Sequence, residues 1–151
     1  MQEKIHFEIN IKAPVKKVWD TMLNQETYQD WTTPFAPGSY YEGSWEKGSK
    51  MIFLSSWGGG MVAEIADNIE HKYISIRHLG EIRDGVEDTT SERVMQWTPA
   101  YENYTFIEKG QETKLEVDME MKSSEANSEM IEMFEEMWPK ALLKLKKICE
   151  R

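Results

Sequence analysis

The sequence lacks most features that identify a secreted, membrane-bound or disulfide-stabilised protein. Its 151 residues include a single cysteine, Cys149, so an intrachain disulfide is excluded. No run of 18 apolar residues is present, which argues against a membrane span. The N-terminal segment MQEKIHFEIN contains no apolar stretch of the kind found in signal peptides. Together these absences predict a cytoplasmic protein.

Sequence motifs for metal binding, nucleotide binding and nucleophilic catalysis are also missing. The three histidines, His6, His71 and His78, do not have metal-ligand spacing, and the chain has no HxH, HExxH or CxxC motif. GxSxG and GxGxxG are absent as well. The triplet Gly58-Gly59-Gly60 is not followed by Lys-Ser or Lys-Thr, which favours a hairpin turn over a phosphate-binding loop. We therefore predict no metal, no cofactor and no catalytic residue.

Positive charge is scarce, with 18 basic against 27 acidic residues and a net charge of −9. An acidic chain repels the phosphate backbone, so we expect no nucleic-acid partner. The basic residues that do cluster fall in the last turns of a predicted helix, where they complement the helix dipole: Lys140, Lys144, Lys146 and Lys147.

Alternating apolar and polar residues indicate strands over most of the chain up to residue 121. Ile5, Phe7, Ile9 and Ile11 alternate with polar residues and predict the first strand. Further strands are predicted at 40–45, 50–57, 61–66, 73–79, 101–108 and 114–121. In 50–57 both alternating sets are apolar, so the inward set stays open. The polar segment 80–93 has no period and is predicted to be a mobile loop.

Helices are predicted after the first strand and at the end of the chain. Pro14 suits the first turn of a helix over 14–23, and Asn24 is a candidate cap for a second over 24–30, with Tyr28 facing inward. The last helix, 125–149, has a broad apolar stripe formed by Met130, Met133, Phe134, Met137, Trp138, Ala141, Leu142, Leu145 and Ile148. Pro139 predicts a bend within it.

This order of elements predicts an α+β fold. A curved antiparallel sheet of six or seven strands wraps the long C-terminal helix, with two short helices after the first strand. The length predicts one domain spanning residues 1–151.

Several stretches, in this order, resemble one protein family. They are Ile11-Lys12-Ala13-Pro14 with Val18-Trp19, Tyr28 with Trp31, Gly38-Ser39 with Glu42-Gly43-Ser44-Trp45 and Gly48, and Met137-Trp138-Pro139-Lys140-Ala141-Leu142. The chain thereby resembles the START-like (Bet v 1-like, SRPBCC) superfamily with its helix-grip fold. It is most similar to the bacterial branch related to the C-terminal domain of the Hsp90 ATPase activator. The resemblance implies a cavity between sheet and helix, and not a particular activity.

The heavy load of aromatic residues and methionine favours a lined cavity over simple core packing. The residues predicted to contact a ligand there come from the strands, their flanking loops and the last helix. They are Trp31, Phe35, Phe53, Trp57, Ile76, His78, Trp97, Tyr104, Phe106, Met130, Phe134 and Met137.

Two ionisable residues are candidates for contacting a ligand or acting as a base in this cavity. His78 shares strand parity with Ile74 and Ile76, so it points inward either as a hydrogen-bonded structural residue or as a ligand contact. Glu64 is either an inward acid paired with Arg77 or His78, able to act as a base, or part of a surface pair.

The leading hypothesis is a non-enzymatic carrier or sensor that binds a small hydrophobic or aromatic ligand. One alternative is a chaperone-associated interaction domain that docks through its acidic surface. Another is a cofactor-free enzyme, such as a cyclase or hydrolase, that uses a cavity His or carboxylate. We also hypothesise that loops 32–38 and 80–93 flank the cavity mouth, unless 80–93 is a solvated connection far from it.

Overall fold

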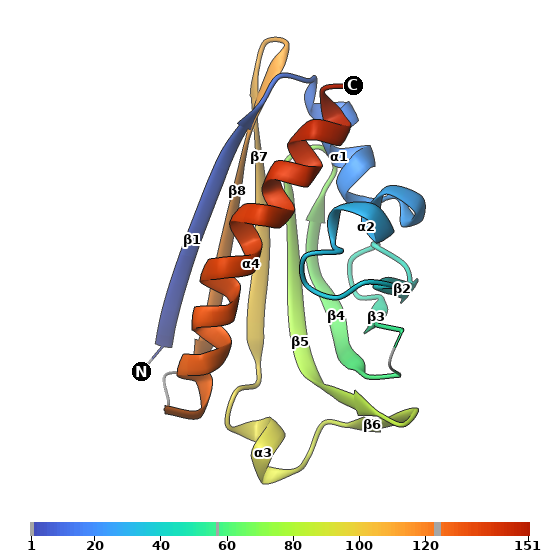
Figure 1. The fold of residues 1–151 in the computed structure, drawn as a ribbon. Coiled ribbons are helices and arrows are strands. Elements are labelled where there is room, and N and C mark those ends of the chain that lie inside the picture. The colour runs from blue at the N-terminus through green and yellow to red at the C-terminus, as the bar shows by residue number, and fades with distance from the viewer. Residues whose placement is uncertain (1, 57, 123–124) are drawn as a thin grey trace.

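The alternation of apolar residues near the N-terminus forms β1 (Gln2–Ile11), an edge strand of one curved antiparallel sheet (Figure 1). The computed structural model describes residues 2–56, 58–122 and 125–151. The other strands are β2 (Tyr40–Gly43), β3 (Lys50–Leu54), β4 (Gly60–Ile69), β5 (Tyr73–Arg83), β6 (Val86–Asp88), β7 (Ala100–Lys109) and β8 (Glu112–Lys122). Their order in the sheet is β1-β8-β7-β5-β4-β3-β2, with β6 paired to β5. The predicted helix-grip architecture is confirmed.

Two short helices follow β1, as predicted. They are α1 (Val15–Leu23) and α2 (Gln25–Trp31), and Asn24 separates them. The Asn24 side chain accepts a hydrogen bond from the Glu26 backbone N–H at 3.0 Å, which caps α2. The buried indole of Trp31 donates to the Met22 carbonyl at 3.1 Å and so ties the two helices together.

The long helix α4 (Glu125–Cys149) runs diagonally across the concave face, and its C-terminal end lies beside α1 (Figure 1). It continues through Pro139, whose side chain is exposed. Its C-terminal half is firmly packed, since Trp138, Ala141 and Leu145 are at most 2% exposed. In its N-terminal half Met130 and Phe134, on the same stripe of the helix, are only half-buried. The two halves of α4 therefore contact the sheet very differently.

The inward set of β3, which the sequence left open, is Met51 and Phe53. Met51 is fully buried, and Phe53 packs against the core. Their partners across the ladder are Ala63 and Met61 on β4. Ala63 is fully buried as well, so this face of the strand pair is the concave one.

The prediction of an aperiodic loop over 80–93 is wrong. Strand β5 extends to Arg83, and Asp84 and Gly85, both with positive φ, form a two-residue turn into β6. The helix α3 (Glu92–Met95) follows and buries Val94. Strand pairing therefore orders this segment, although its polar sequence has no apolar period that would indicate a strand. The sheet has eight strands, against the expected six or seven.

Ion pairs, one within the segment and one to β3, also hold residues 80–93. Arg93 lies 2.6 Å from the Glu81 carboxylate, and Lys50 of β3 lies 2.8 Å from Glu87. Strand β4 is also longer than predicted, because its pairing with β5 continues to Ile69, opposite Tyr73. None of the helices in the described parts of the chain is long and apolar enough to cross a membrane.

Gly60 is fixed by the close approach of β3. A Cβ on Gly60 would lie 1.9 Å from the Phe53 carbonyl oxygen, a backbone atom that cannot move alone. We therefore expect Gly60→Ala to lower the free energy of unfolding by about 2 kcal/mol or more in urea denaturation. Gly110→Ala is the control. Its turn is open but has a φ of +64°, so we expect a loss of only about 1 kcal/mol. Equal losses in the two variants would contradict the steric explanation.

Candidate ligand-binding site

A carboxylate lies on the otherwise apolar concave face of the sheet. Alternation along β7 places Ala100, Glu102, Tyr104 and Phe106 on one face, and the three apolar or aromatic members are buried. The Glu102 side chain is only 15% exposed. A charge in this position requires hydrogen-bond partners, because the apolar surroundings cannot solvate it.

Two neighbouring side chains supply those partners. The His78 Nε2 atom lies 3.0 Å from Glu102 Oε1, and the Tyr104 hydroxyl donates to Glu102 Oε2. The β5–β7 register, which pairs Ile76 with Glu102 and His78 with Ala100, brings the three together. Burial first, and then the nearby Glu102 charge, raises the pKa of Tyr104 well above its usual value. Tyr104 therefore keeps its proton and remains a hydrogen-bond donor. We call His78, Glu102 and Tyr104 the polar relay.

Aromatic rings surround the polar relay. The Trp138 ring of α4 lies 4.9 Å from that of Phe35, 6.0 Å from that of Trp31 and 6.0 Å from that of Tyr104, between centroids. The Phe53 ring lies 5.8 Å from that of His78. These contacts join α4, α2, the loop after α2 and the sheet.

Tyr28 connects the two sides of this aromatic cluster. Its ring centroid lies 5.6 Å from that of Trp31 and 6.3 Å from that of Phe53. Burial, followed by the charge of Glu102, raises the pKa of the Tyr28 phenol. The phenol therefore stays neutral.

Two ring nitrogens in this cluster have no partner among the described residues. They are His78 Nδ1 and Trp138 Nε1, and both are buried. A third atom of this kind, Arg77 Nε, lies on the opposite face of the sheet. An unsatisfied buried polar atom costs about 1–3 kcal/mol, so two of them on one face of the fold require an explanation.

The predicted contact residues divide into several groups. Ring contacts join Trp31, Phe35, Phe53, His78 and Tyr104, directly or through Trp138 and Tyr28. Ile76 is buried beside Glu102, while Met130, Phe134 and Met137 of α4 are half-buried. Trp97 is buried after α3. Phe106 packs on Trp19 of α1, 5.0 Å between centroids. Trp57 lies outside the described residues.

Glu102 and Trp138 were not among the predicted site residues. Glu102 shares strand parity with Tyr104 and Phe106, and this signal could have identified it. The acid that the sequence did single out, Glu64, lies on the outer face, where Arg77 Nη1 donates to it at 2.8 Å. Both side chains are more than one third exposed, so the surface-pair alternative is confirmed and the inward-acid alternative is wrong.

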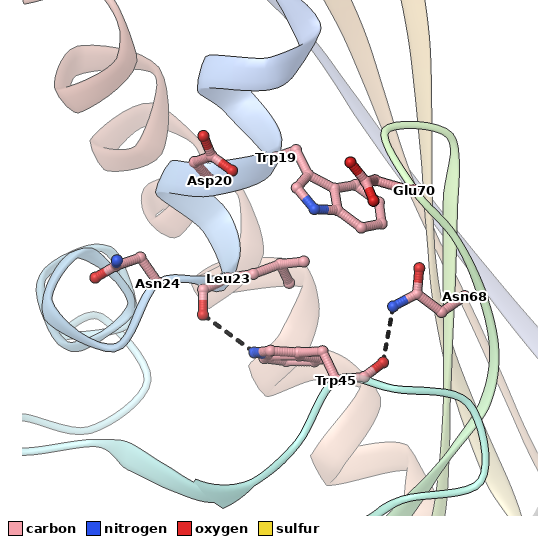
Figure 2. Close-up of a pocket in the computed structure, with 7 residues that line it drawn as sticks. All are labelled: Trp19, Asp20, Leu23, Asn24, Trp45, Asn68 and Glu70. Atoms are coloured by element: carbon pink, nitrogen blue, oxygen red, sulfur yellow. Dashed lines mark hydrogen bonds between the residues drawn. The ribbon is translucent and has the colours of Figure 1, made fainter.

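An open cleft of about 410 Å³ lies away from the polar relay, between α1 and the loops after β2 and β4 (Figure 2). Trp19 and Trp45 form two of its walls, and Asp20 and Glu70 place carboxylates at its rim. The Trp45 indole is fixed because it donates to the Leu23 carbonyl at 3.1 Å. The described residues that line this cleft are separate from the polar relay.

A second surface cleft, of about 640 Å³, lies on the other side of Glu70. Val15, Tyr73, Phe106 and Ile107 are among its lining residues. Phe106, predicted to line the interior cavity, thus reaches this cleft instead of the polar relay.

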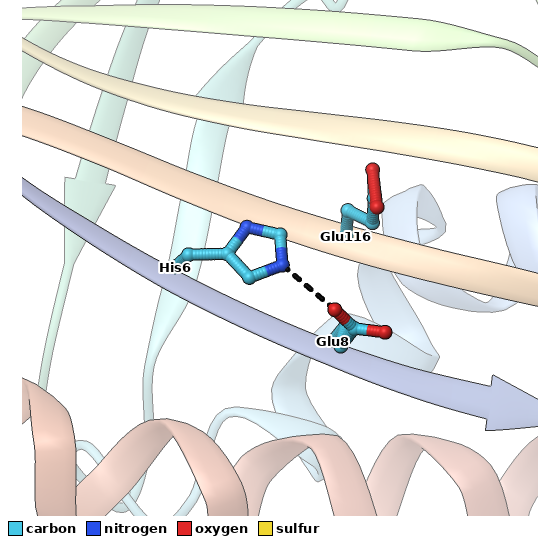
Figure 3. Close-up of side chains that lie close together, drawn as sticks. All are labelled: His6, Glu8 and Glu116. Carbon is cyan, nitrogen blue, oxygen red and sulfur yellow. Dashed lines mark hydrogen bonds and ion pairs between the residues drawn. The ribbon is translucent and has the colours of Figure 1, made fainter.

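A charged cluster covers the outer face of β1 and β8. Figure 3 shows His6 and Glu8 of β1 beside Glu116 of β8, close enough to one another to be metal ligands. The Lys114 ammonium lies 3.1 Å from Glu8 and 3.5 Å from Glu116 and already neutralises these carboxylates. The arrangement is therefore accounted for as an ion-pair network.

Comparison with known proteins gives a family and a fold. The sequence profile of the family described as "Activator of Hsp90 ATPase homolog 1-like protein" matches residues 12–150. No curated protein is matched by sequence.

Solved structures with the same fold include protein MLL2253 from Mesorhizobium loti, with a TM-score of 0.75 and 14% identity over 96% of this chain and 95% of that one. The Aha1 dimer from Colwellia psychrerythraea has a TM-score of 0.72 and 18% identity, over 98% and 96%. CalU16 from Micromonospora echinospora has a TM-score of 0.64 and 17% identity, over 97% and 65%. At these identities the similarity extends to the fold alone.

The hydrogen bonds of His6 make the stability of the folded protein depend on pH. Hydrogen bonds to Asp118 at 2.6 Å and to Glu8 at 3.0 Å raise the His6 pKa above 6.5. Because the folded state favours the protonated ring, this stabilisation is complete below pH 6.5 and is lost as the pH rises through the raised pKa.

We expect His6→Gln to show a smaller loss of stability than the wild type between about pH 5.5 and about pH 8.5, measured by urea unfolding. His71 and His78 are present in both proteins, so the difference isolates His6. An identical pH dependence in the two proteins would show that the His6 contacts contribute nothing.

Proposed function

The chain belongs to the family of Activator of Hsp90 ATPase homolog 1-like proteins, and on this premise we propose that it binds a small aromatic or apolar ligand. The ligand lies between the concave face of the sheet and α4. The protein acts as a carrier or sensor.

One observation carries the proposal. The cluster of aromatic rings contains two buried ring nitrogens without partners among the described residues, His78 Nδ1 and Trp138 Nε1. A core that served packing alone would gain stability from apolar atoms in these positions. A ligand with a polar group beside either nitrogen would supply the missing partner and keep its apolar part against the rings.

The uneven packing of α4 supports an entry route. Lys144 Nζ donates to Thr33 Oγ1 at 2.6 Å and lies 3.4 Å from Asp30, which ties the C-terminal half of α4 to α2 and the loop after it. The N-terminal half presents half-buried Met130 and Phe134, and methionine adapts to ligands of different shape. The N-terminal half is therefore the part of α4 that moves to admit a ligand.

Titration with naphthalene, followed by tryptophan fluorescence, tests this proposal. We expect a micromolar dissociation constant, roughly −8 kcal/mol. Phe134→Glu places a charge on the inner side of α4 and should weaken binding by about tenfold or more. The control, Met133→Glu, introduces the same charge at the neighbouring exposed position and should leave binding unchanged. Failure of the wild type to bind, or equal effects of the two substitutions, rejects the proposal.

A second candidate function is docking on a basic segment of a chaperone. The cleft in Figure 2 combines the rings of Trp19 and Trp45 with the carboxylates of Asp20 and Glu70, which suits a Lys or Arg side chain. The net charge of −9 attracts the same kind of partner. The name of the family points to ATPase stimulation as the result of such docking.

For this candidate we expect the protein to stimulate the ATPase activity of an Hsp90-type chaperone. Asp20→Lys combined with Glu70→Lys should reduce the stimulation by about fivefold or more. Glu112→Lys with Glu132→Lys changes the net charge equally at exposed positions outside the cleft and should preserve it. Absence of stimulation by the wild type removes this candidate.

A further inference from the structure

We infer that the ligand is a hydroxylated aromatic compound, a phenol or naphthol, whose hydroxyl group donates a hydrogen bond to His78 Nδ1. The inference rests on the proposed function, since it assumes that a ligand occupies the space between the concave face and α4. It identifies the chemical class of that ligand from the hydrogen-bonding state of the polar relay.

The polar relay sets which nitrogen of His78 carries the proton. In the proposed state Glu102 is a carboxylate that only accepts hydrogen bonds, so its Oε1, 3.0 Å from His78 Nε2, faces an Nε2–H group. In the same state the His78 ring carries one N–H, which leaves a lone pair on Nδ1. Because Nδ1 is buried and has no partner in the described part of the chain, it is an unused acceptor. The partner that it lacks is a donor.

Tyr104 holds the carboxylate in the orientation that this assignment needs. Its hydroxyl donates to Glu102 Oε2, so both carboxylate oxygens are engaged and Oε1 stays directed at His78. The register of β5 and β7 fixes the backbones beneath the three side chains. The sheet thus holds His78 Nε2 at Glu102 and leaves Nδ1 as the free ring nitrogen among the described residues.

The surroundings favour a neutral ring over a carboxylic acid. Phe53 lies beside His78, and Trp138 lies beside Tyr104. In the described residues that make the ring contacts and hydrogen bonds of this cluster, neither Lys nor Arg occurs, so an anionic ligand would face Glu102 without a counter-ion. A phenol is neutral and therefore brings no negative charge next to Glu102.

Three matched ligands test the inference: naphthalene, 2-naphthol and 2-methoxynaphthalene. The last two have an oxygen on the same carbon, but only 2-naphthol can donate. We expect wild-type protein to bind 2-naphthol about tenfold more tightly than 2-methoxynaphthalene, the effect of one hydrogen bond to a buried acceptor. Naphthalene reports whether the space accepts an aromatic ligand at all.

Glu102→Gln provides a sharper test, because it reverses the polarity of the relay. The amide introduced by this substitution can donate to His78 Nε2, which moves the imidazole proton to Nδ1 and turns the acceptor into a donor. We expect the variant to bind 2-naphthol and 2-methoxynaphthalene with equal affinity, and so to lose the preference for 2-naphthol. The control, Glu64→Gln, alters a carboxylate on the outer face and should retain the preference.

The outcomes separate the inference from the proposed function. No binding of naphthalene by the wild type overturns the proposed function. Binding of naphthalene with equal affinity for the two oxygenated ligands, or with a preference for 2-methoxynaphthalene, overturns only the inference. Retention of the 2-naphthol preference in Glu102→Gln also overturns it. If that variant does not fold, ¹⁵N NMR of the wild-type histidines decides, since a proton on His78 Nδ1 contradicts the inference.

Discussion

The packing of Trp138 against four separate parts of the chain is the contact on which the rest of the structure depends. Its ring lies within 6.2 Å, between centroids, of Phe7 on β1, Trp31 on α2, Phe35 in the loop after α2, and Tyr104 on β7. One side chain of α4 thereby fixes the distance of the helix from the sheet and the position of the two short helices.

The packing around Trp138 also makes the interior mainly aromatic. The side chains that pack around Trp138 on the concave face are mostly aromatic. The polar atoms of buried Tyr and Trp rings require hydrogen-bond partners. Glu102 finds two partners, in His78 and Tyr104, whereas the His78 and Trp138 nitrogens find none among the described residues. The firm C-terminal half of α4 and its looser N-terminal half place this region at the boundary between a rigid and an adaptable part of the helix. Such a boundary suits ligand exchange, because one side keeps the site in shape while the other moves.

The fold followed from local patterns with few errors. Alternation predicted β1 and β8, the apolar stripe predicted α4, and Asn24 predicted the cap of α2. The errors fall where polar residues form strands, as in β6, where an Asp-Gly turn and ion pairs order the chain. The aromatic site residues were only partly predicted. Trp31, Phe35, Phe53, His78 and Tyr104 meet through ring contacts, but Phe106 packs on Trp19 at α1.

The sequence by itself determined most of the strands and the helices α1, α2 and α4, and it determined which residues turn inward where only one alternating set is apolar, because side-chain direction repeats every two residues in a strand and every 3.6 in a helix. It could not determine which inward residues meet. Glu64 and Glu102 are both strand carboxylates, yet one lies on the outer face beside Arg77 and the other lies on the inner face beside His78. The pairing of β4 with β5 places Glu64 beside Arg77, and the pairing of β5 with β7 places Glu102 near His78; both pairings join residues far apart in the chain. The tertiary structure alone therefore decided that a histidine whose Nδ1 has no partner in the described chain lies at the centre of an aromatic site.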